Sequence, residues 1–222
     1  MDIIRSAPWA HIIAAIIGYA AGSVLMACII AKRKGGDIGA QGNGNPGASN
    51  TAMAYGIGAG PARAAWDIVK PMLAFFICAV ILRLPDNASM LAAYMAVIGH
   101  VFPAWRKLKG GKGFAPYIGA MFCVQPMLFL FTAAIAAVAA AVADFITAAT
   151  FVTIAICPLW AWFIDVSYGI PATLLSLLLL WRHRENIRKI RAGTEPRLTS
   201  VLGKYKDRFG RIAGAIKDDG EE

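Results

Sequence analysis

The sequence has no lysine or arginine between Gly113 and Trp181, and it is poor in charge as a whole. Asp, Glu, Lys and Arg make up 16% of the 222 residues, whereas soluble domains average about 25%. Hydrophobic residues make up 58%, an excess that is typical of helices that cross lipid. The composition therefore excludes an ordinary soluble domain and predicts an integral membrane protein.

Cysteine is also scarce. The four cysteines each lie in an apolar stretch without CxxC spacing, at Cys28, Cys78, Cys123 and Cys157. Such cysteines are typical of small buried side chains rather than of disulfides or metal ligands. A cleavable signal peptide is not indicated, because the first apolar run ends in the basic triplet 32–34 rather than in a small-residue cleavage site.

The apolar stretches and the basic residues between them predict the topology. Six stretches are candidate membrane segments, at 8–31, 64–82, 88–105, 114–143, 148–164 and 170–181. Lys and Arg concentrate at 32–34, 106–112 and 182–217, and the positive-inside rule places these clusters in the cytoplasm. An even number of crossings must then separate the second cluster from the third.

The long stretch 114–143 decides the number of spans. The last two stretches supply two crossings, so 114–143 crosses twice or not at all. The pair Gln125-Pro126 interrupts it, and proline weakens a helix, so two short spans hinged there satisfy the charge pattern. We therefore expect an all-α membrane protein with seven transmembrane helices, the N-terminus outside and the C-terminus cytoplasmic. Five spans is the alternative.

The chain is expected to form a single polytopic membrane domain over residues 1–222. Within it, residues 182–222 form a basic cytoplasmic tail. Anionic lipid attracts Lys and Arg at the inner leaflet. This tail is therefore predicted to lie partly at the membrane interface.

The first cytoplasmic loop, residues 35–50, is rich in glycine and asparagine. Its bare backbone can bring N–H groups close to an anion and can form an oxyanion-binding nest. The loop residues expected to bind substrate are Asn43, Gly44, Asn45, Gly47, Ser49 and Asn50. The alternative is a flexible connector in which Ser49 or Asn50 caps the next helix.

The second loop combines glycine with lysine. Bare backbone beside ammonium groups suits phosphate, although the spacing differs from that of a P-loop. The candidate phosphate ligands are Lys109, Gly110, Gly111, Lys112 and Gly113. A positive-inside anchor is the alternative, and it explains the preceding basic residues Arg106 and Lys107 well. It does not explain the glycines around Lys112.

The third basic region, residues 182–196, is predicted to be a helix. It would place His183 and Asn186 on one face at i, i+3, and Glu185 and Lys189 on another face as an i, i+4 pair. A histidine and an amide at the bilayer edge can serve as a base or as hydrogen-bond donors. The alternative is an interfacial helix anchored by its arginines.

Five polar residues lie inside the apolar stretches or at their ends. Asp67 and Lys70 are spaced i, i+3, and charges at that depth need a partner, so we expect a structural pair that supports the site. His100 is interpreted as a buried hydrogen-bonding residue in preference to a catalytic one. Thr147 and Thr150 follow a predicted cytoplasmic turn, where they either reach the site or cap the next helix.

These motifs resemble those of the bacterial acyl-phosphate:glycerol-3-phosphate acyltransferases (the PlsY family). The likeness runs from Gly22 to about Glu195, most of the chain. It is carried by the segments 44–50, 99–103, 109–113, 183–187 and 193–195. The segment 44–50 looks like the family's SGNxGATN loop, and Asp67 and Lys70 also stand where the family has them.

The resemblance implies a seven-span enzyme that moves a fatty acyl group from acyl phosphate to the first hydroxyl of glycerol 3-phosphate, giving lysophosphatidic acid. It implies the bacterial cell (inner) membrane with a cytoplasmic active face. Acyl phosphate, glycerol 3-phosphate and the lipid bilayer are the expected partners. No acyl-CoA, metal, cofactor or nucleic acid is expected.

The resemblance also assigns roles to residues. Lys112 and the glycine-rich loop would hold phosphate, His183 and Asn186 would orient the acceptor, and Glu185 and Thr147 would contact substrate. The family offers no clear protein base, so the donor phosphate would help take the proton. Catalysis would then depend on positioning and on preorganised donors that stabilise charge.

The chain departs from the family pattern in the first loop. Asn43 stands where serine is usual, Met53 where arginine is usual, and Ser49 where threonine is usual. Loss of the arginine removes a planar fork for phosphate, and Arg63 or Lys32 is the candidate replacement. In addition, Pro116 replaces a threonine, and the segment 25–27 replaces Pro-Phe-Gly.

Three alternatives to the family's activity follow. One is a diverged acyltransferase of the same fold with another polar or phosphorylated acceptor, which the changed first loop favours. A small anion transporter is the second, but it would need a polar stripe through the bilayer, and residues 113–181 carry almost no charge. A non-catalytic membrane scaffold is the third, and it would not need phosphate loops.

Overall fold

The computed structural model describes residues 8–41, 48–55, 58–200 and 203. The regular elements in these ranges are helical throughout, which confirms the all-α prediction. Their order is α2 (Pro8–Ser23), α3 (Met26–Arg33), α4 (Ala48–Tyr55), α5 (Ala59–Phe76), α6 (Asp86–Val101), α7 (Phe114–Val124), α8 (Pro126–Ala143), α9 (Ile146–Ile164), α10 (Val166–Arg182) and α11 (Arg184–Arg191). Single turns of 3-10 helix lie at Ile38–Ala40 and Ala104–Arg106, and a π-helical turn at Ile77–Ile81 follows α5.

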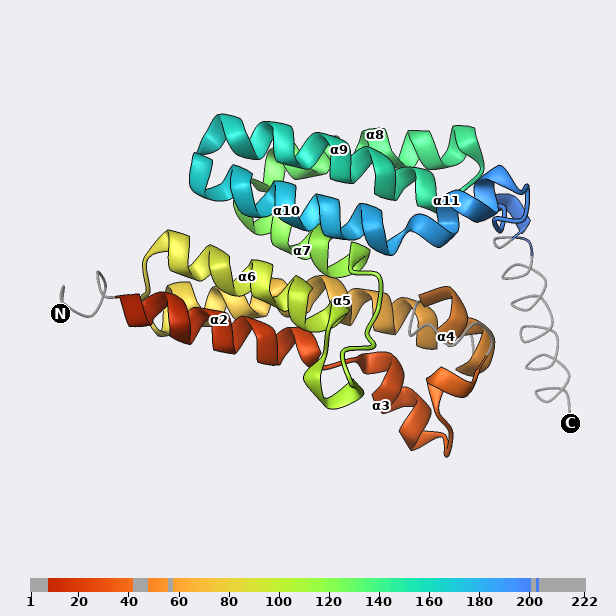
Figure 1. Ribbon diagram of the computed structural model, residues 1–222, viewed down its shortest axis with the longest axis horizontal. Helices are drawn as coiled ribbons and strands as arrows, with labels where there is room; N and C mark the ends of the chain where they lie inside the picture. The colour runs from red at the N-terminus through yellow and green to blue at the C-terminus, as the bar shows by residue number, and fades with distance from the viewer. Residues whose placement is uncertain (1–7, 42–47, 56–57, 201–202, 204–222) are drawn as a thin grey trace, which may run out of the picture.

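The long helices lie side by side along one axis (Figure 1). One group contains α2, α5 and α6, the other contains α8, α9 and α10, and α7 lies between them. The short helices α3, α4 and α11 gather at one end of the bundle, together with the loop between α6 and α7. The three basic regions of the sequence therefore meet at a single end.

Among the described residues, five helical segments are long and apolar enough to cross a membrane: Pro8–Arg33, Ala59–Ile81, Asp86–Arg106, Pro126–Ala143 and Ile146–Ile164. The helices α7 and α10 are also apolar but shorter. Short segments can cross where the bilayer thins around them. Large apolar side chains face outward, as at Phe163 (90% exposed) and Val142 (83% exposed). An outward apolar surface of this kind suits contact with lipid.

The stretch 114–143 is divided into two helices at Gln125, where the sequence predicts a hinge. Gln125 has extended backbone (φ −157°, ψ 99°), and its side chain accepts a hydrogen bond from the Met127 N–H. Pro126 opens α8, a position where its missing N–H costs nothing. Because the chain reverses here, α7 and α8 lie against each other.

The first apolar stretch is also broken, which the sequence analysis did not foresee. Leu25 takes extended backbone (φ −94°, ψ 103°) between α2 and α3. The break occurs although the segment 25–27 holds no proline. The carbonyl groups that it frees need partners, since water is scarce at this depth.

Side chains from α5 and the turn after α6 supply those partners. Lys70 Nζ donates to Gly22 O at 2.7 Å, Trp105 Nε1 to Ser23 O at 2.8 Å, and Trp66 Nε1 to Val24 O at 3.2 Å. The Lys70 ammonium also suits the negative end of the helix dipole. Long-range capping therefore stabilises the break between α2 and α3.

Small residues allow α2 and α6 to pack closely. A Cβ atom at Gly18 would overlap the Ala92 carbonyl, and one at Gly22 would overlap the Ala96 carbonyl. Close backbone approach through small residues is the usual way in which membrane helices associate. This contact fixes the end of α6 from which the loop toward α7 leaves.

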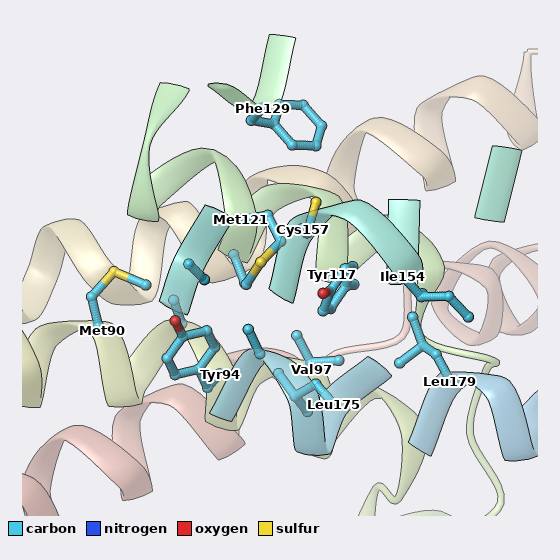
Figure 2. Close-up of a cluster of buried hydrophobic side chains, with 14 of the residues drawn as sticks. Met90, Tyr94, Val97, Tyr117, Met121, Phe129, Ile154, Cys157, Leu175 and Leu179 are labelled. Atoms are coloured by element: carbon cyan, nitrogen blue, oxygen red, sulfur yellow. The ribbon is translucent and has the colours of Figure 1, made fainter. Parts of the chain in front are cut away.

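A buried apolar cluster joins α6, α7, α9 and α10 (Figure 2). It includes Val97 of α6, Tyr117 of α7 and Leu179 of α10, all with no exposed surface. The Tyr117 hydroxyl is hydrogen-bonded to Ser176 Oγ at 2.8 Å. The cluster thereby fixes the first turn of α7 relative to the last turn of α10, and both turns lead into the basic end of the bundle.

Candidate active site

Four polar side chains from separate segments form one hydrogen-bonded network at the basic end. Lys112 Nζ donates to Asn186 Oδ1 in a short hydrogen bond. Asn186 Nδ2 donates to Glu195 Oε1 at 2.6 Å and to Thr147 Oγ1 at 3.3 Å. Thr147 Oγ1 donates to the same Glu195 oxygen at 2.6 Å. The structure thus brings together the second loop, α11, the segment after α11 and the start of α9.

The chemistry of its two neighbours fixes the orientation of the Asn186 amide. An ionised carboxylate only accepts hydrogen bonds and an ammonium only donates them. Asn186 must therefore present its NH₂ group to Glu195 and its oxygen to Lys112. Glu195 is 8% exposed, and its second oxygen, Oε2, has no hydrogen-bond partner in the described part of the chain.

Lys112 keeps donor capacity in this arrangement. Its ammonium has three N–H groups, and the bond to Asn186 is its single side-chain hydrogen bond within the described ranges. Burial lowers the pKa of Lys112 from its ordinary value, and the nearby Glu195 carboxylate acts in the opposite direction. The side chain is half-buried, so its remaining N–H groups can reach an anion that enters from the basic end.

The first turn of α7 adds backbone donors beside Lys112. Gly113 has φ 93°, in the left-handed region, and a Cβ there would press on the Val101 and Leu179 side chains. The N–H groups of Gly113, Phe114 and Ala115 have no acceptor among the residues that the structure describes. Such N–H groups at a helix N-terminus, together with the helix dipole, favour an anion.

Gly110 and Gly111 correct the prediction for the phosphate loop. Their N–H groups donate to Val101 O and His100 O, both at 3.1 Å. Their carbonyl groups accept from the Arg182 guanidinium at 3.2 and 3.1 Å. These two amides are therefore directed into the protein and do not fit a role as phosphate donors. Glycine is needed for packing instead, because a Cβ at Gly111 would overlap the His100 ring.

His183 lies at the junction of two helices, as the C-cap of α10 and the N-cap of α11, so the single helix predicted for residues 182–196 is not found. Its ring packs edge-to-face against Phe151, and its Nδ1 lies 2.8 Å from Leu179 O. A carbonyl oxygen only accepts, so Nδ1 carries the proton and Nε2 is the acceptor. Burial lowers the pKa of His183 to about 4, which keeps the imidazole neutral near pH 7.

Two further predicted residues lie away from the network. Lys109 and Glu185 are exposed, and neither side chain has a hydrogen bond or ion pair with Lys112 or Asn186 in the described ranges. The expected ion pair between Glu185 and Lys189 is not found there either. The substrate roles of Lys109 and Glu185 stay predictions.

Most of the predicted first-loop ligands cannot be placed. Asn43, Gly44, Asn45 and Gly47 lie outside the described residues, as does the side chain of Ser49. Asn50 is 3% exposed, and its Nδ2 donates to Gln41 O at 2.9 Å, which joins the two ends of the loop. The substrate-binding roles of these residues stay predictions.

A buried ionic cluster lies beneath the second loop. The expected pairing is confirmed, since Asp67 Oδ1 lies 2.9 Å from Lys70 Nζ. Asp67 Oδ2 also lies 2.7 Å from Arg63 Nε, so Arg63 is paired within this cluster, and its role as a replacement for the missing first-loop arginine stays a prediction. His100 is 1% exposed and its Nδ1 lies 2.8 Å from Lys70 Nζ, which supports the hydrogen-bonding interpretation of this histidine.

Two site residues had no role in the sequence analysis. Glu195 was noticed only as part of a motif, although an acid two residues after a helix-ending glycine in a basic tail is a signal in itself. Arg182 was treated as part of an interfacial anchor, yet it binds the Gly110 and Gly111 carbonyls. Both roles depend on contacts between distant segments. Thr147, by contrast, reaches the network, which favours that alternative over a cap.

Comparisons with known proteins point to one family. A family model described as glycerol-3-phosphate acyltransferase matches residues 12–193. A glycerol-3-phosphate acyltransferase of Agrobacterium fabrum is 33% identical over 196 residues, covering 87% of this chain and 95% of that protein. One of Bacillus subtilis is 35% identical over 185 residues, covering 82% and 95%.

Solved structures show the same fold. The crystal structure of PlsY (YgiH), an integral membrane glycerol 3-phosphate acyltransferase, in its glycerol 3-phosphate form matches with a TM-score of 0.76 at 28% identity, covering 84% of this chain and 94% of that one. Its lysophosphatidic acid form matches with a TM-score of 0.75 over 86% and 98%. From the extent of the family match and of the identity to its members, this chain belongs to the glycerol-3-phosphate acyltransferase family.

Proposed function

We propose that this chain transfers a fatty acyl group from acyl phosphate to the first hydroxyl of glycerol 3-phosphate, giving lysophosphatidic acid. The observation that carries the proposal is the Lys112 ammonium beside the open N-terminus of α7, which is held by the half-buried Asn186 amide, itself hydrogen-bonded to the buried Glu195 carboxylate. This is a preorganised site for a phosphate group. Family membership and the relatives' names point to the same acceptor.

The location follows from the arrangement of charge. We infer seven spans, with α7 and α10 crossing as short helices, the N-terminus outside and the C-terminus inside. The basic end of the bundle then faces the cytoplasm of a bacterial cell (inner) membrane. The support is that 32–34, 106–112 and the basic residues of α11 lie at one end of the bundle (Figure 1), where soluble phosphate esters are accessible.

The reaction requires one bond to form and one to break. The acceptor hydroxyl oxygen attacks the carbonyl carbon of acyl phosphate, the carbon–oxygen bond to phosphate breaks, and the hydroxyl proton passes to the leaving phosphate. Lys112 and the N–H groups that open α7 stabilise the negative charge on phosphate and on the carbonyl oxygen. His183 Nε2 accepts a hydrogen bond from the acceptor hydroxyl and orients it.

A diverged acceptor is the second candidate function. Met53 and Asn43 stand where the family has arginine and serine, and Arg63 is engaged with Asp67 at 2.7 Å. Because Arg63 is already paired, the charge that would hold an acceptor phosphate in the first loop is weaker than in the usual family pattern. An acceptor with a different polar group would need no such charge.

A purified preparation in lipid vesicles tests these proposals. Palmitoyl phosphate and palmitoyl-CoA are each supplied with labelled glycerol 3-phosphate, and a parallel series replaces the acceptor with glycerol or with another phosphorylated alcohol. Lysophosphatidate formed from palmitoyl phosphate alone is the expected result. Product from palmitoyl-CoA alone would refute the donor, and faster acylation of another acceptor would establish the diverged enzyme.

A further inference from the structure

The segment that follows α11 is attached to the turn between α8 and α9. We call residues Glu195–Thr199 the C-terminal strap. The Asp144 carboxylate accepts from the Thr199 N–H at 2.8 Å through Oδ1 and from the Thr199 hydroxyl at 3.0 Å through Oδ2. The Asp144 carbonyl oxygen accepts from the Leu198 N–H at 2.8 Å. Arg197 lies over the Phe145 ring, 4.6 Å from its centroid.

The other end of the strap carries Glu195. Gly193 (φ 69°) turns the chain out of α11, and Glu195 then reaches Thr147 and Asn186, each at 2.6 Å. The strap is thus attached to the same helical turn at two places, through Asp144 and through Thr147. The attachment through Asp144 includes no residue that is expected to touch substrate. The attachment through Glu195 includes two that are, Thr147 and Asn186.

The backbone of Asp144 is specialised for this contact. It has φ 57°, which is uncommon outside glycine and is tolerated best by Asp and Asn. This conformation ends α8 and aims both carboxylate oxygens at Thr199. Nothing else in the turn between α8 and α9 requires a carboxylate, since Asp144 has no ion pair in the described part of the chain.

We propose that Asp144 is a positioning residue for acyl transfer: it fastens the C-terminal strap to the start of α9, and the strap presents Glu195 to Asn186. This proposal rests on the proposed function, because it assigns Lys112 and Asn186 to the reaction. If the strap is loosened, Glu195 no longer orders the Asn186 amide, and Asn186 no longer aims the Lys112 ammonium. A shift of about 1 Å in such a group can cost up to about a hundredfold in rate.

Asp165 offers a matched control at the opposite end of the bundle. It lies in the turn between α9 and α10, it is exposed, and its carboxylate accepts from the Ser167 N–H at 2.7 Å. The Asp165 carboxylate, like that of Asp144, accepts a hydrogen bond from a backbone N–H group. Unlike Asp144, Asp165 has no hydrogen bond to the network or to the strap in the described part of the chain. Removal of either carboxylate deletes an aspartate from a turn between two helices, half-buried at Asp144 and exposed at Asp165, and only Asp144 is connected to Glu195 through the strap.

The experiment measures kcat and KM for glycerol 3-phosphate in Asp144→Gly, Asp144→Asn and Asp165→Gly. Glycine and asparagine both tolerate the left-handed backbone at position 144, so backbone strain is not introduced. We expect Asp144→Gly to lower kcat/KM about tenfold, because two hydrogen bonds to Thr199 are lost. Asp144→Asn keeps one acceptor and should recover most of the activity. Asp165→Gly should match the wild-type enzyme.

Thr199→Val shows whether the effect passes through the strap. The variant removes the hydroxyl bond to Asp144 and should lower kcat/KM in the wild-type background. In the Asp144→Gly background it should add nothing, since its partner is already absent. Additive losses in the double variant would contradict the proposed contact.

The pH profile supplies a readout that a general loss of stability would not produce. Besides Glu195, the charged groups that act on Lys112 are Glu185, Lys189 and Arg182. The Glu195 carboxylate raises the pKa of Lys112, so a loosened strap should move the alkaline limb of kcat/KM to lower pH in Asp144→Gly and leave it unchanged in Asp165→Gly.

The outcomes separate this inference from the proposed function. A wild-type enzyme that makes no lysophosphatidate refutes the function itself. An active wild-type enzyme with Asp144→Gly equal to Asp165→Gly in rate and in pH profile refutes the positioning role. Activity lost in both glycine variants together, with lowered thermal stability in both, would also refute it, because the effect would be that of any turn.

Discussion

At the scale of single residues, the site depends on one side-chain amide, whose oxygen accepts a hydrogen bond and whose NH₂ group donates one. Asn186 meets a group that only donates, Lys112, and a group that only accepts, Glu195. A second carboxylate in its place would lack the donor that faces Glu195. Lys112 and Asn186 could be named as site candidates from the sequence. The role of Glu195 could not, because it depends on how the chain after α11 folds back.

Replacement of Asn186 by Asp tests this two-sided role. The variant is nearly isosteric, but it places a carboxylate 2.6 Å from the Glu195 carboxylate, and like charges at that distance repel strongly. We expect kcat/KM to fall about a hundredfold or more. The expression level and thermal stability of the same preparation serve as the control. An Asn186→Asp enzyme as active as the wild type would contradict the assigned orientation.

The state of His183 predicts a simple pH dependence. The pKa of His183 is lowered to about 4, chiefly by burial, so the imidazole is neutral at any pH well above that value and becomes charged only in acid. Any limb of kcat/KM near pH 6.5, where phosphate esters also titrate, should therefore be the same in the wild type and in His183→Gln. A limb near pH 6.5 that disappears in His183→Gln would refute the neutral acceptor role.

At the scale of elements, the long apolar helices could be predicted from the sequence. Of the two breaks within the apolar stretches, one could be predicted and the other could not. The break at Gln125 could be predicted from the sequence, because the following Pro126 disfavours a continuous helix. The break at Leu25 depends on Lys70, Trp66 and Trp105 from elsewhere in the chain, and no local pattern contains that information. The inward amides of Gly110 and Gly111 have the same origin, since their partners are the end of α6 and Arg182.

The packing role of Gly111 makes a prediction for the second loop. A Cβ at Gly111 would overlap the His100 imidazole, and the Lys70 ammonium at 2.8 Å holds that ring in place. Gly111→Ala should therefore displace the loop, destabilise the fold by about 1–3 kcal/mol and lower kcat/KM more than tenfold. Gly58→Ala is the matched control, because nothing lies within 4 Å of its Cβ position. Equal behaviour of the two variants would contradict the packing role.

At the scale of the whole molecule, charge segregation predicts much of the architecture. The three basic clusters are far apart in the sequence, yet their described residues lie at one end of the bundle (Figure 1). The positive-inside rule foresees this, because each cluster is held on one side of the membrane independently of the others. It does not foresee how the loops contact one another, since those contacts depend on side-chain geometry.

The proposed topology, with seven spans and the N-terminus outside, predicts which positions can be labelled from each side of the membrane. Single cysteines are placed at Gln125, Asp165, Lys107 and Thr199 in a protein whose four native cysteines are replaced by alanine. A membrane-impermeant thiol reagent should label positions 125 and 165 in intact cells. Positions 107 and 199 should be labelled only after the membrane is opened. Labelling of position 125 from the inside would favour five spans.

The central claim is that the Lys112 ammonium, held by Asn186 and Glu195, binds phosphate for acyl transfer to glycerol 3-phosphate. The most direct measurement is the rate of lysophosphatidate formation from palmitoyl phosphate by Lys112→Ala, with Lys107→Asn as the control. The control removes a charge from the same exposed loop and keeps a residue that tolerates the φ of 53° at position 107. We expect no measurable product from folded Lys112→Ala and a near-normal rate from Lys107→Asn. Equal rates in the two variants would contradict the account.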